Sequence, residues 1–211
     1  GSQYSRLIAR RVRESKVYCE IISHDSSWED VAKLNPRGVI LSGGPASVYE
    51  PDAPLAPSWV FDAHLPVLGI CYGMQVLVHQ LGGKVAAGEK REYGHAVLHQ
   101  NSSTNPLFHG LDQASPVWMS HGDRIVHPPP GFVALAYTDN SPIAAIGNGE
   151  GILGIQFHPE VVHTAQGKAI IDNFLFRVCG CTQIWTPSNF VTATVREIQA
   201  QVGKGNVICA L

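Results

Sequence analysis

The 211-residue sequence has no long hydrophobic run and no marked excess of charge of either sign. No apolar stretch approaches the roughly 20 residues that a transmembrane helix needs, and no signal-peptide pattern is present. We therefore expect a soluble, cytoplasmic protein without a membrane partner. The formal net charge of −2 gives no electrostatic reason to expect nucleic acid as a partner. Internal repeats and low-complexity tracts are absent as well.

Cysteine is scarce, and its odd count of five does not suit a disulfide framework. A chain of this length can bury a core without covalent links, so free thiols in a reducing compartment are the simplest account. Cys19 and Cys209 lie in apolar segments, where cysteine packs as a small hydrophobic residue. Cys179 and Cys181 with His163 suggest zinc, but usual zinc pairs are separated by about two to four residues. We expect no metal site.

The chain does contain an alternation of strand-like and helix-like segments. Helices are expected at 1–15, 26–34, 72–81, 164–180 and 187–205, and strands at 16–22, 37–45, 67–70 and 205–211. Strands that are apolar on both faces and alternate with helices predict a parallel sheet covered on both sides. Closely spaced strands between residues 82 and 158 predict hairpins that join this sheet. The expected fold class is therefore α/β, with a mostly parallel central sheet plus antiparallel strands.

Cys71 lies between the strand-like run and the helix-like run of residues 67–83. Gly69 and Gly73 leave room for the sharp turn of a nucleophile elbow, which would hold the Cys71 side chain at a surface corner above the sheet. The N-terminus of the following helix favours a thiolate over a thiol. Gln75 lies one helical turn further on the same side and could contact a substrate. The alternative is a core cysteine in a tight turn with a solvated Gln75, and this motif alone does not decide between the two.

A base for Cys71 is expected at His158, which follows the strand of residues 152–157. The carboxyl ends of parallel strands are where ligands bind in α/β sheets. Pro159 holds His158 in an extended conformation, so Glu160, two residues on, projects to the same side. A carboxylate there would fix the imidazole tautomer and stabilise its cation. Cys71, His158 and Glu160 are thus predicted to form a catalytic triad.

Two further motifs complete the predicted site. His121, in Ser-His-Gly-Asp at 120–123, is an alternative base, but we favour a binding role for this segment, which we expect to be a polar loop. Acyl chemistry needs hydrogen-bond donors for an oxyanion. The backbone N–H of Tyr72 and that of Gly44, in Ser-Gly-Gly-Pro at 42–45, are the predicted donors.

Four motifs together resemble the class I glutamine amidotransferases: Gly-Ile-Cys-Tyr-Gly-Met-Gln at 69–75, Ser-Gly-Gly-Pro at 42–45, Ser-His-Gly-Asp at 120–123 and Phe-His-Pro-Glu-Val at 157–161. The resemblance covers nearly all of residues 1–181. Stretches such as "SGGPASVYEPDAP" and "CGCTQIW" are similar to the glutaminase domains of the GMP synthetase branch. Residues 182–211 resemble the linker and the beginning of that branch's ATP pyrophosphatase domain, so we expect an excerpt of a longer protein. The family's first strand would precede Gly1.

This resemblance implies a flavodoxin-like three-layer fold and a definite chemistry. Cys71 would attack the carboxamide of L-glutamine to form a γ-glutamyl thioester, His158 would transfer protons, and Glu160 would orient His158. Tyr72 and Gly44 would form the oxyanion hole. The residues implied to line the glutamine pocket are Gln75, Ser120, Gly122 and Asp123.

The resemblance also implies partners outside this chain. The domain itself would need no cofactor, whereas ATP, Mg²⁺ and XMP would bind the missing pyrophosphatase domain, which would use the ammonia to make GMP. The full-length enzyme would be a homodimer. The alternatives are a γ-glutamyl hydrolase or another cysteine hydrolase on the same scaffold, and a non-catalytic interaction or metal-binding module.

Overall fold

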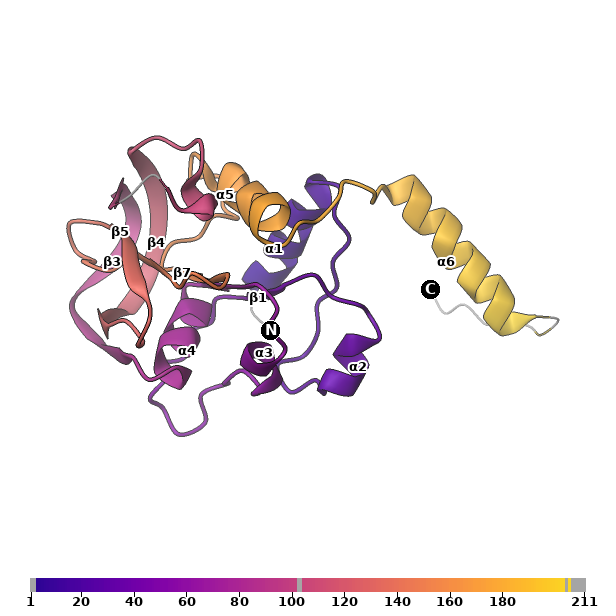
Figure 1. The fold of residues 1–211 in the computed structure, drawn as a ribbon, viewed down its shortest axis with the longest axis horizontal. Helices are drawn as coiled ribbons and strands as arrows, with labels where there is room; N and C mark the ends of the chain where they lie inside the picture. Colours follow the sequence, from indigo (N-terminus) through magenta and orange to yellow (C-terminus); the bar gives the residue numbers. More distant parts are fainter. Residues whose placement is uncertain (1–2, 102–103, 204, 206–211) are drawn as a thin grey trace.

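The computed structural model describes residues 3–101, 104–203 and 205. Its centre is a seven-stranded mixed sheet with the strand order β1-β2-β7-β6-β5-β3-β4 (Figure 1). Three neighbouring strands are parallel: β1 (Val39–Leu41), β2 (Val67–Ile70) and β7 (Ile152–Ile155). The other strands continue the sheet in antiparallel fashion: β6 (Ala145–Gly147), β5 (Val133–Tyr137), β3 (Lys84–Gln100) and β4 (Ala114–His127). The predicted α/β class with added hairpin strands is confirmed.

Helices lie on both sides of the parallel strands (Figure 1). The α-helices are α1 (Gln3–Glu14), α2 (Trp28–Ala32), α3 (Trp59–Asp62), α4 (Tyr72–Gln80), α5 (Gly167–Asn173) and α6 (Pro187–Val202). A 3₁₀ turn, η1 (Pro106–Phe108), precedes β4, and a π-helical turn, η2 (Phe174–Val178), extends α5. Ser27 caps α2, as its place before Trp28 predicts, by accepting a hydrogen bond from the Asp30 N–H at 3.2 Å.

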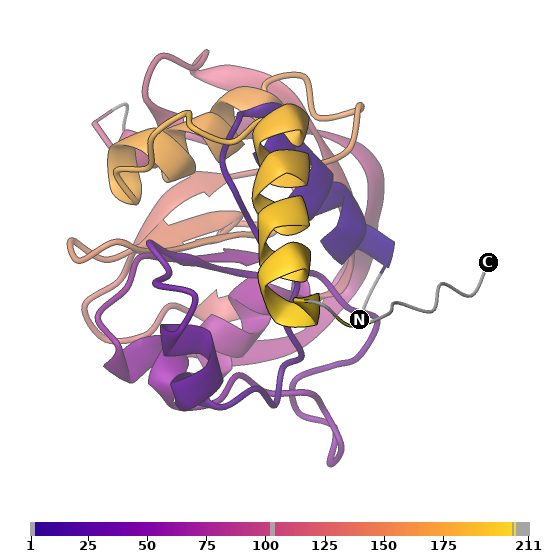
Figure 2. The ribbon, with the colours of Figure 1, turned by 90° about the vertical axis from the view of Figure 1, so that its right-hand side faces the viewer.

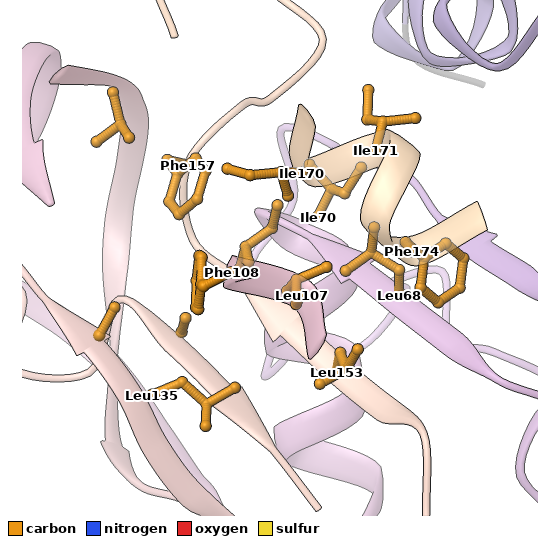
Figure 3. Close-up of a cluster of buried hydrophobic side chains, with 14 of the residues drawn as sticks. Leu68, Ile70, Leu107, Phe108, Leu135, Leu153, Phe157, Ile170, Ile171 and Phe174 are labelled. Atoms are coloured by element: carbon orange, nitrogen blue, oxygen red, sulfur yellow. The ribbon is translucent and has the colours of Figure 1, made fainter. Parts of the chain in front are cut away.

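Strand β2 separates the two halves of the core because successive side chains on a strand point to opposite faces. Leu68 and Ile70 pack with residues of α1, α5, η1 and η2, and Figure 3 shows the centre of this cluster. Val67 packs with Val76 and Leu77 of α4 on the other face. The continuous apolar run of β2 is therefore buried on both sides, which gives the three-layer arrangement.

Some sequence expectations differ from the structure. Residues 17–22 form no part of a β-ladder in the described chain, and Cys19 instead donates its thiol hydrogen to the Ala9 carbonyl of α1 at 3.4 Å. Residues 120–123 are not a loop but lie within β4, whose side chains alternate between buried and more exposed positions. The strand expected at 205–211, with Cys209, lies outside the described residues except for Gly205.

Helix α6 lies outside the layered body, to which residues 181–186 connect it (Figures 1 and 2). The Trp185 N–H donates to the Lys16 carbonyl at 2.9 Å and anchors this connection to the end of α1. The apolar side chains Val191, Val195 and Ile198 of α6 are exposed.

Candidate active site

The turn from β2 into α4 holds Cys71 in a strained backbone conformation. Its φ of 53° and ψ of −108° are rare for a residue with a side chain. The turn is tight: a Cβ at Gly69 would lie 2.6 Å from the Gly73 carbonyl oxygen, and one at Gly73 would lie 2.8 Å from Leu41 Cβ. The Cys71 N–H donates to the Ile155 carbonyl of β7 at 2.8 Å. Such a strand-turn-helix corner is the geometry of a nucleophile elbow.

Cys71 is buried, with only 4% of its surface exposed, which corrects the expectation of a surface corner. Strand β4 and the end of β7 cover it, yet its sulfur has polar neighbours. The Ser120 carbonyl lies 3.6 Å from Sγ and accepts from the thiol, and the Gln156 amide Nε2 donates to Sγ at 3.7 Å. A side chain with these neighbours is screened from bulk water without lying in an apolar core.

His158 and Glu160 lie together at the C-terminal end of β7. The imidazole Nδ1 is 2.7 Å from Glu160 Oε1, and both side chains are almost fully buried. The backbone of the pair is fixed on three sides. The His158 N–H donates to the Trp118 carbonyl at 3.0 Å, the Thr164 hydroxyl donates to the His158 carbonyl at 2.5 Å, and Arg11 Nε donates to the Glu160 carbonyl at 2.9 Å.

Cys71 and His158 meet above Gly43, at the end of β1. A Cβ on Gly43 would lie 3.2 Å from His158 Cε1 and 3.7 Å from Cys71 Cβ, so a side chain there would press against the imidazole. Burial lowers the pKa of His158, but the hydrogen bonds and charges of Cys71 and Glu160 outweigh this effect and raise that pKa to about 10. The arrangement favours an imidazolium between a sulfur and a carboxylate.

The predicted pocket residues lie close to Cys71 but in unequal roles. Gln75 is buried, and its Nε2 donates to the Asp123 carbonyl at 3.4 Å and to Gln156 Oε1 at 3.5 Å. Its amide thus links β4 to Gln156, a neighbour of the Cys71 sulfur. Ser120 presents its carbonyl to the sulfur. Asp123 Oδ1 accepts from the Tyr49 hydroxyl at 2.7 Å. Gly122, between Ser120 and Asp123 on β4, lies near Arg91 and Tyr93 of β3.

The two predicted oxyanion donors flank the same corner. Tyr72 is the first residue of α4, where a backbone N–H has no intrahelical acceptor. Gly44 lies against the Tyr72 ring, where a Cβ would be 3.4 Å from Tyr72 Cδ1. Both residues are therefore brought to the Cys71 turn.

Gln156, Tyr4 and Tyr49 are among the neighbours of the site that were not predicted. Gln156 had a usable signal, because it lies two residues before His158 and so faces the same side. Tyr4 was counted only as an apolar residue of α1, yet its ring centroid lies 4.7 Å from that of His158. Tyr49 lies in the segment after β1, and no pattern indicated its contact with Asp123.

No group of three metal-ligating side chains gathers within residues 3–101, 104–203 and 205. His163 stacks on Trp118, with ring centroids 4.5 Å apart, whereas Cys179 is buried beside Gly38. None of the helices in the described part of the chain is long and apolar enough to span a membrane.

Known proteins resemble this chain at two levels. Residues 1–178 match the family model of glutamine amidotransferase class-I. Over its whole length the chain is 60% identical to a GMP synthase [glutamine-hydrolyzing] of Dehalococcoides mccartyi and 56% identical to one from Thermomicrobium roseum. In each case the match covers 40% of the relative's length. The chain thus spans about 40% of the length of these curated relatives.

Solved structures of two proteins are also similar to this chain. A Thermoplasma acidophilum protein, provisionally assigned as one of the subunits of a GMP synthase, matches 95% of this chain and 94% of its own length with a TM-score of 0.76 and 29% identity. A Thermotoga maritima glutamine amidotransferase shares the fold over 68% of this chain, with a TM-score of 0.57 and 20% identity. The family model covers most of the chain, and the strand-Cys-helix corner is intact. The chain therefore belongs to the class I glutamine amidotransferase family.

Proposed function

We propose that this chain is the glutamine amidotransferase domain of a GMP synthase and hydrolyses L-glutamine to supply ammonia. The proposal is supported by the 60% identity over all 211 residues to an enzyme of that name. In this proposal residues 1–181 form the amidotransferase domain, and residues 182–211 lead into an ATP pyrophosphatase domain. That further domain would bind ATP, Mg²⁺ and XMP, and the whole enzyme would be a homodimer.

The first half of the reaction forms a thioester. The Cys71 thiolate attacks the side-chain carbonyl carbon of glutamine, and the carbonyl oxygen becomes an oxyanion that accepts hydrogen bonds from the N–H groups of Tyr72 and Gly44. His158 then gives its proton to the departing nitrogen. The C–N bond breaks, ammonia leaves, and a γ-glutamyl thioester remains on Cys71.

The second half regenerates the enzyme. Neutral His158 takes a proton from a water molecule, whose oxygen attacks the thioester carbon. The C–S bond breaks, glutamate leaves, and the thiolate and imidazolium are restored. Glu160 accepts a hydrogen bond from the Nδ1–H throughout, which keeps Nε2 directed at the reacting atoms and stabilises the cation. The glutamine pocket is lined by Gln75, Ser120, Gly122 and Asp123. Gln75 acts through its hydrogen bonds to the Asp123 carbonyl and to Gln156.

One observation carries this proposal: a buried imidazole lies 2.7 Å from a carboxylate and meets the cysteine of the strained corner above Gly43. The test uses an L-glutamine analogue with a chloroketone in place of the carboxamide, because labelling does not require ammonia to be consumed. We expect one label per chain, on Cys71, seen by mass spectrometry. Cys71→Ala should abolish labelling, and His158→Gln should slow it by about 100-fold or more.

Cys181→Ala is the matched control, because Cys181 is a partly exposed thiol away from the corner, and it should label at the wild-type rate. Labelling of Cys71→Ala at the wild-type rate would remove Cys71 from its role. Release of glutamate from γ-glutamyl peptides but not from free glutamine would favour the γ-glutamyl hydrolase instead.

A further inference from the structure

A buried polar cluster lies beside the proposed site and has no part in the mechanism above. It consists of Glu92 on β3, His121 on β4, and Thr138 and Ser141 in the turn that joins β5 to β6, all at most 6% exposed. A buried carboxylate is costly unless it is paired and hydrogen-bonded. The hydrogen bonds within this cluster, the Glu92 cluster, indicate how that cost is met.

The hydrogen bonds of His121 define its protonation. Nδ1 lies 2.8 Å from the Asp123 carbonyl, which can only accept, so Nδ1 carries a hydrogen. Nε2 lies 3.2 Å from Glu92 Oε2. Without a hydrogen on Nε2, a lone pair would face an ionised carboxylate oxygen. The Ser141 hydroxyl also lies 3.4 Å from Nε2, but it is closer to Glu92 Oε2, at 2.6 Å. With the hydroxyl hydrogen directed at Oε2, either His121 carries two protons or Glu92 carries one.

The surroundings of Glu92 favour the ionised carboxylate. The Ser141 hydroxyl donates to Oε2 at 2.6 Å, and the Thr138 hydroxyl donates to Oε1 at 2.9 Å. The Ser141 N–H donates to Thr138 Oγ1 at 3.0 Å, which leaves the hydroxyl hydrogen free to point at Glu92. Burial raises the pKa of Glu92, but the hydrogen bonds from His121, Ser141 and Thr138 outweigh it, so the pKa is lowered. The cluster is therefore an imidazolium-carboxylate pair.

The pair lies where the β3–β4 ladder is interrupted. The register passes from Ala87↔Asp123 to Glu92↔His121, so residues 88–91 of β3 stand opposite Gly122 alone. Backbone pairing therefore does not hold β4 at this point. The side-chain pair joins the two strands at the edge of the interruption, in place of the missing ladder bonds.

This segment of β4 connects directly to the nucleophile. Ser120, which precedes His121, presents its carbonyl to Cys71 Sγ, and the Asp123 carbonyl accepts from both His121 Nδ1 and Gln75 Nε2. Gln75 in turn contacts Gln156, which donates to the same sulfur. A shift of His121 would therefore displace groups on two sides of Cys71.

We propose that Glu92 is a positioning residue for the glutamine pocket: it holds His121 as an imidazolium, and the pair fixes residues 120–123 where the strand ladder is broken. This inference rests on the proposed glutaminase function. Glu92 does not contact Cys71, and His158 and Glu160 are held by hydrogen bonds outside the cluster. The loss of Glu92 should therefore weaken recognition of the glutamine moiety more than it changes the reactivity of the thiolate.

The test compares two reagents on the full chain. The glutamine chloroketone requires the pocket, whereas iodoacetamide reports only the reactivity of Cys71. In Glu92→Gln, the chloroketone concentration that gives half-maximal inactivation should rise about tenfold or more, with its maximal rate and the iodoacetamide rate within threefold of wild type. Ser141→Ala should shift the half-maximal concentration in the same direction by less. Glu150→Gln, in an exposed turn, is the control and should match wild type.

An unchanged half-maximal concentration in a folded Glu92→Gln would overturn the proposal. An equal fall in the rates of Cys71 modification by the chloroketone and by iodoacetamide would overturn it as well. A second measurement does not depend on any variant folding: the ¹⁵N shifts of His121 in the wild-type chain at pH 7 should be those of an imidazolium. Shifts of a neutral ring would also overturn it. If the wild-type chain does not prefer the L- over the D-chloroketone, the proposed glutaminase function fails, and the ¹⁵N result still reports on the ion pair.

Discussion

At the scale of the residue, the site depends on two side chains held in unusual states. Cys71 has a positive φ, which costs on the order of 1–3 kcal/mol in a residue with a Cβ. The bonds that offset this cost are those of the corner, such as the Cys71 N–H to the Ile155 carbonyl. His158 is almost fully buried, yet its pKa is about 10 because Cys71 and Glu160 flank it.

The raised pKa of His158 predicts a pH-dependent contribution to stability. Its ordinary pKa is 6.5, so the contribution is fully present below about pH 6.5 and is lost as the pH rises through about 10. The difference in unfolding free energy between wild type and His158→Gln should therefore shrink by more than about 1 kcal/mol between pH 6 and pH 10.5. Urea denaturation at several pH values measures it.

The exposed His127→Gln serves as the control, with no such trend expected. A difference between wild type and His158→Gln that stayed constant over the whole range would contradict the charged state of His158.

The residues near Cys71 differ in how far the sequence could predict them. The approach of Glu160 to His158 follows from a two-residue spacing in extended chain, which is a local property. The contacts of Tyr4 and Tyr49 join segments about 150 and 70 positions apart from their partners. Only the packing of α1 and of the segment after β1 onto the sheet brings these rings to the site.

At the scale of the element, β4 was the main error of the sequence analysis. Ser-His-Gly-Asp at 120–123 looks like a loop because its residues are polar and contain glycine. In the structure its buried positions alternate with partly exposed ones, and His121 and Asp123 face inwards. Polar residues are accommodated in the interior of this strand because each finds a hydrogen-bond partner there.

The contact between α4 and β1 depends on Gly73. A Cβ at this position would overlap the carbonyl oxygen of Leu41 and lie 2.8 Å from its Cβ, and neither backbone can move without opening the Cys71 turn. Gly73→Ala should lower the unfolding free energy by about 3 kcal/mol. Gly149→Ala, where nothing lies within 4 Å, should change it by less than about 0.5 kcal/mol. Chemical denaturation of both variants measures these changes. Equal unfolding free energies of Gly73→Ala and Gly149→Ala would refute the close packing at Gly73.

At the scale of the whole molecule, the layered body and α6 are distinct. The body has buried clusters on both faces of the sheet, whereas Val191, Val195 and Ile198 of α6 are exposed. The connection to the body runs through Trp185, near the end of α1. The apolar stripe of α6 thus adds nothing to the core that holds Cys71 and His158.

Removal of residues 187–211 should therefore leave the body intact. We expect the melting temperature of the shortened chain to stay within about 2 °C of that of the full chain, because no side chain described in this segment belongs to a buried cluster. Calorimetry of both chains, together with the iodoacetamide rate of Cys71, provides the measurement. A drop of about 10 °C or more would mean that α6 stabilises the amidotransferase body.

The sequence by itself determined the α/β class, most of the helices, two of the parallel strands and the corner at Cys71, because these follow from local periodicity and from glycines at fixed spacing. Only the tertiary structure decided that the Cys71 thiol is buried, that Gln156 and Ser120 are its neighbours, and that Glu92 pairs with His121. These contacts join residues between 29 and 85 positions apart. Their free energies arise only once the sheet has assembled; a local pattern could show that Gln156 faces the same side as His158, but not that either residue meets Cys71.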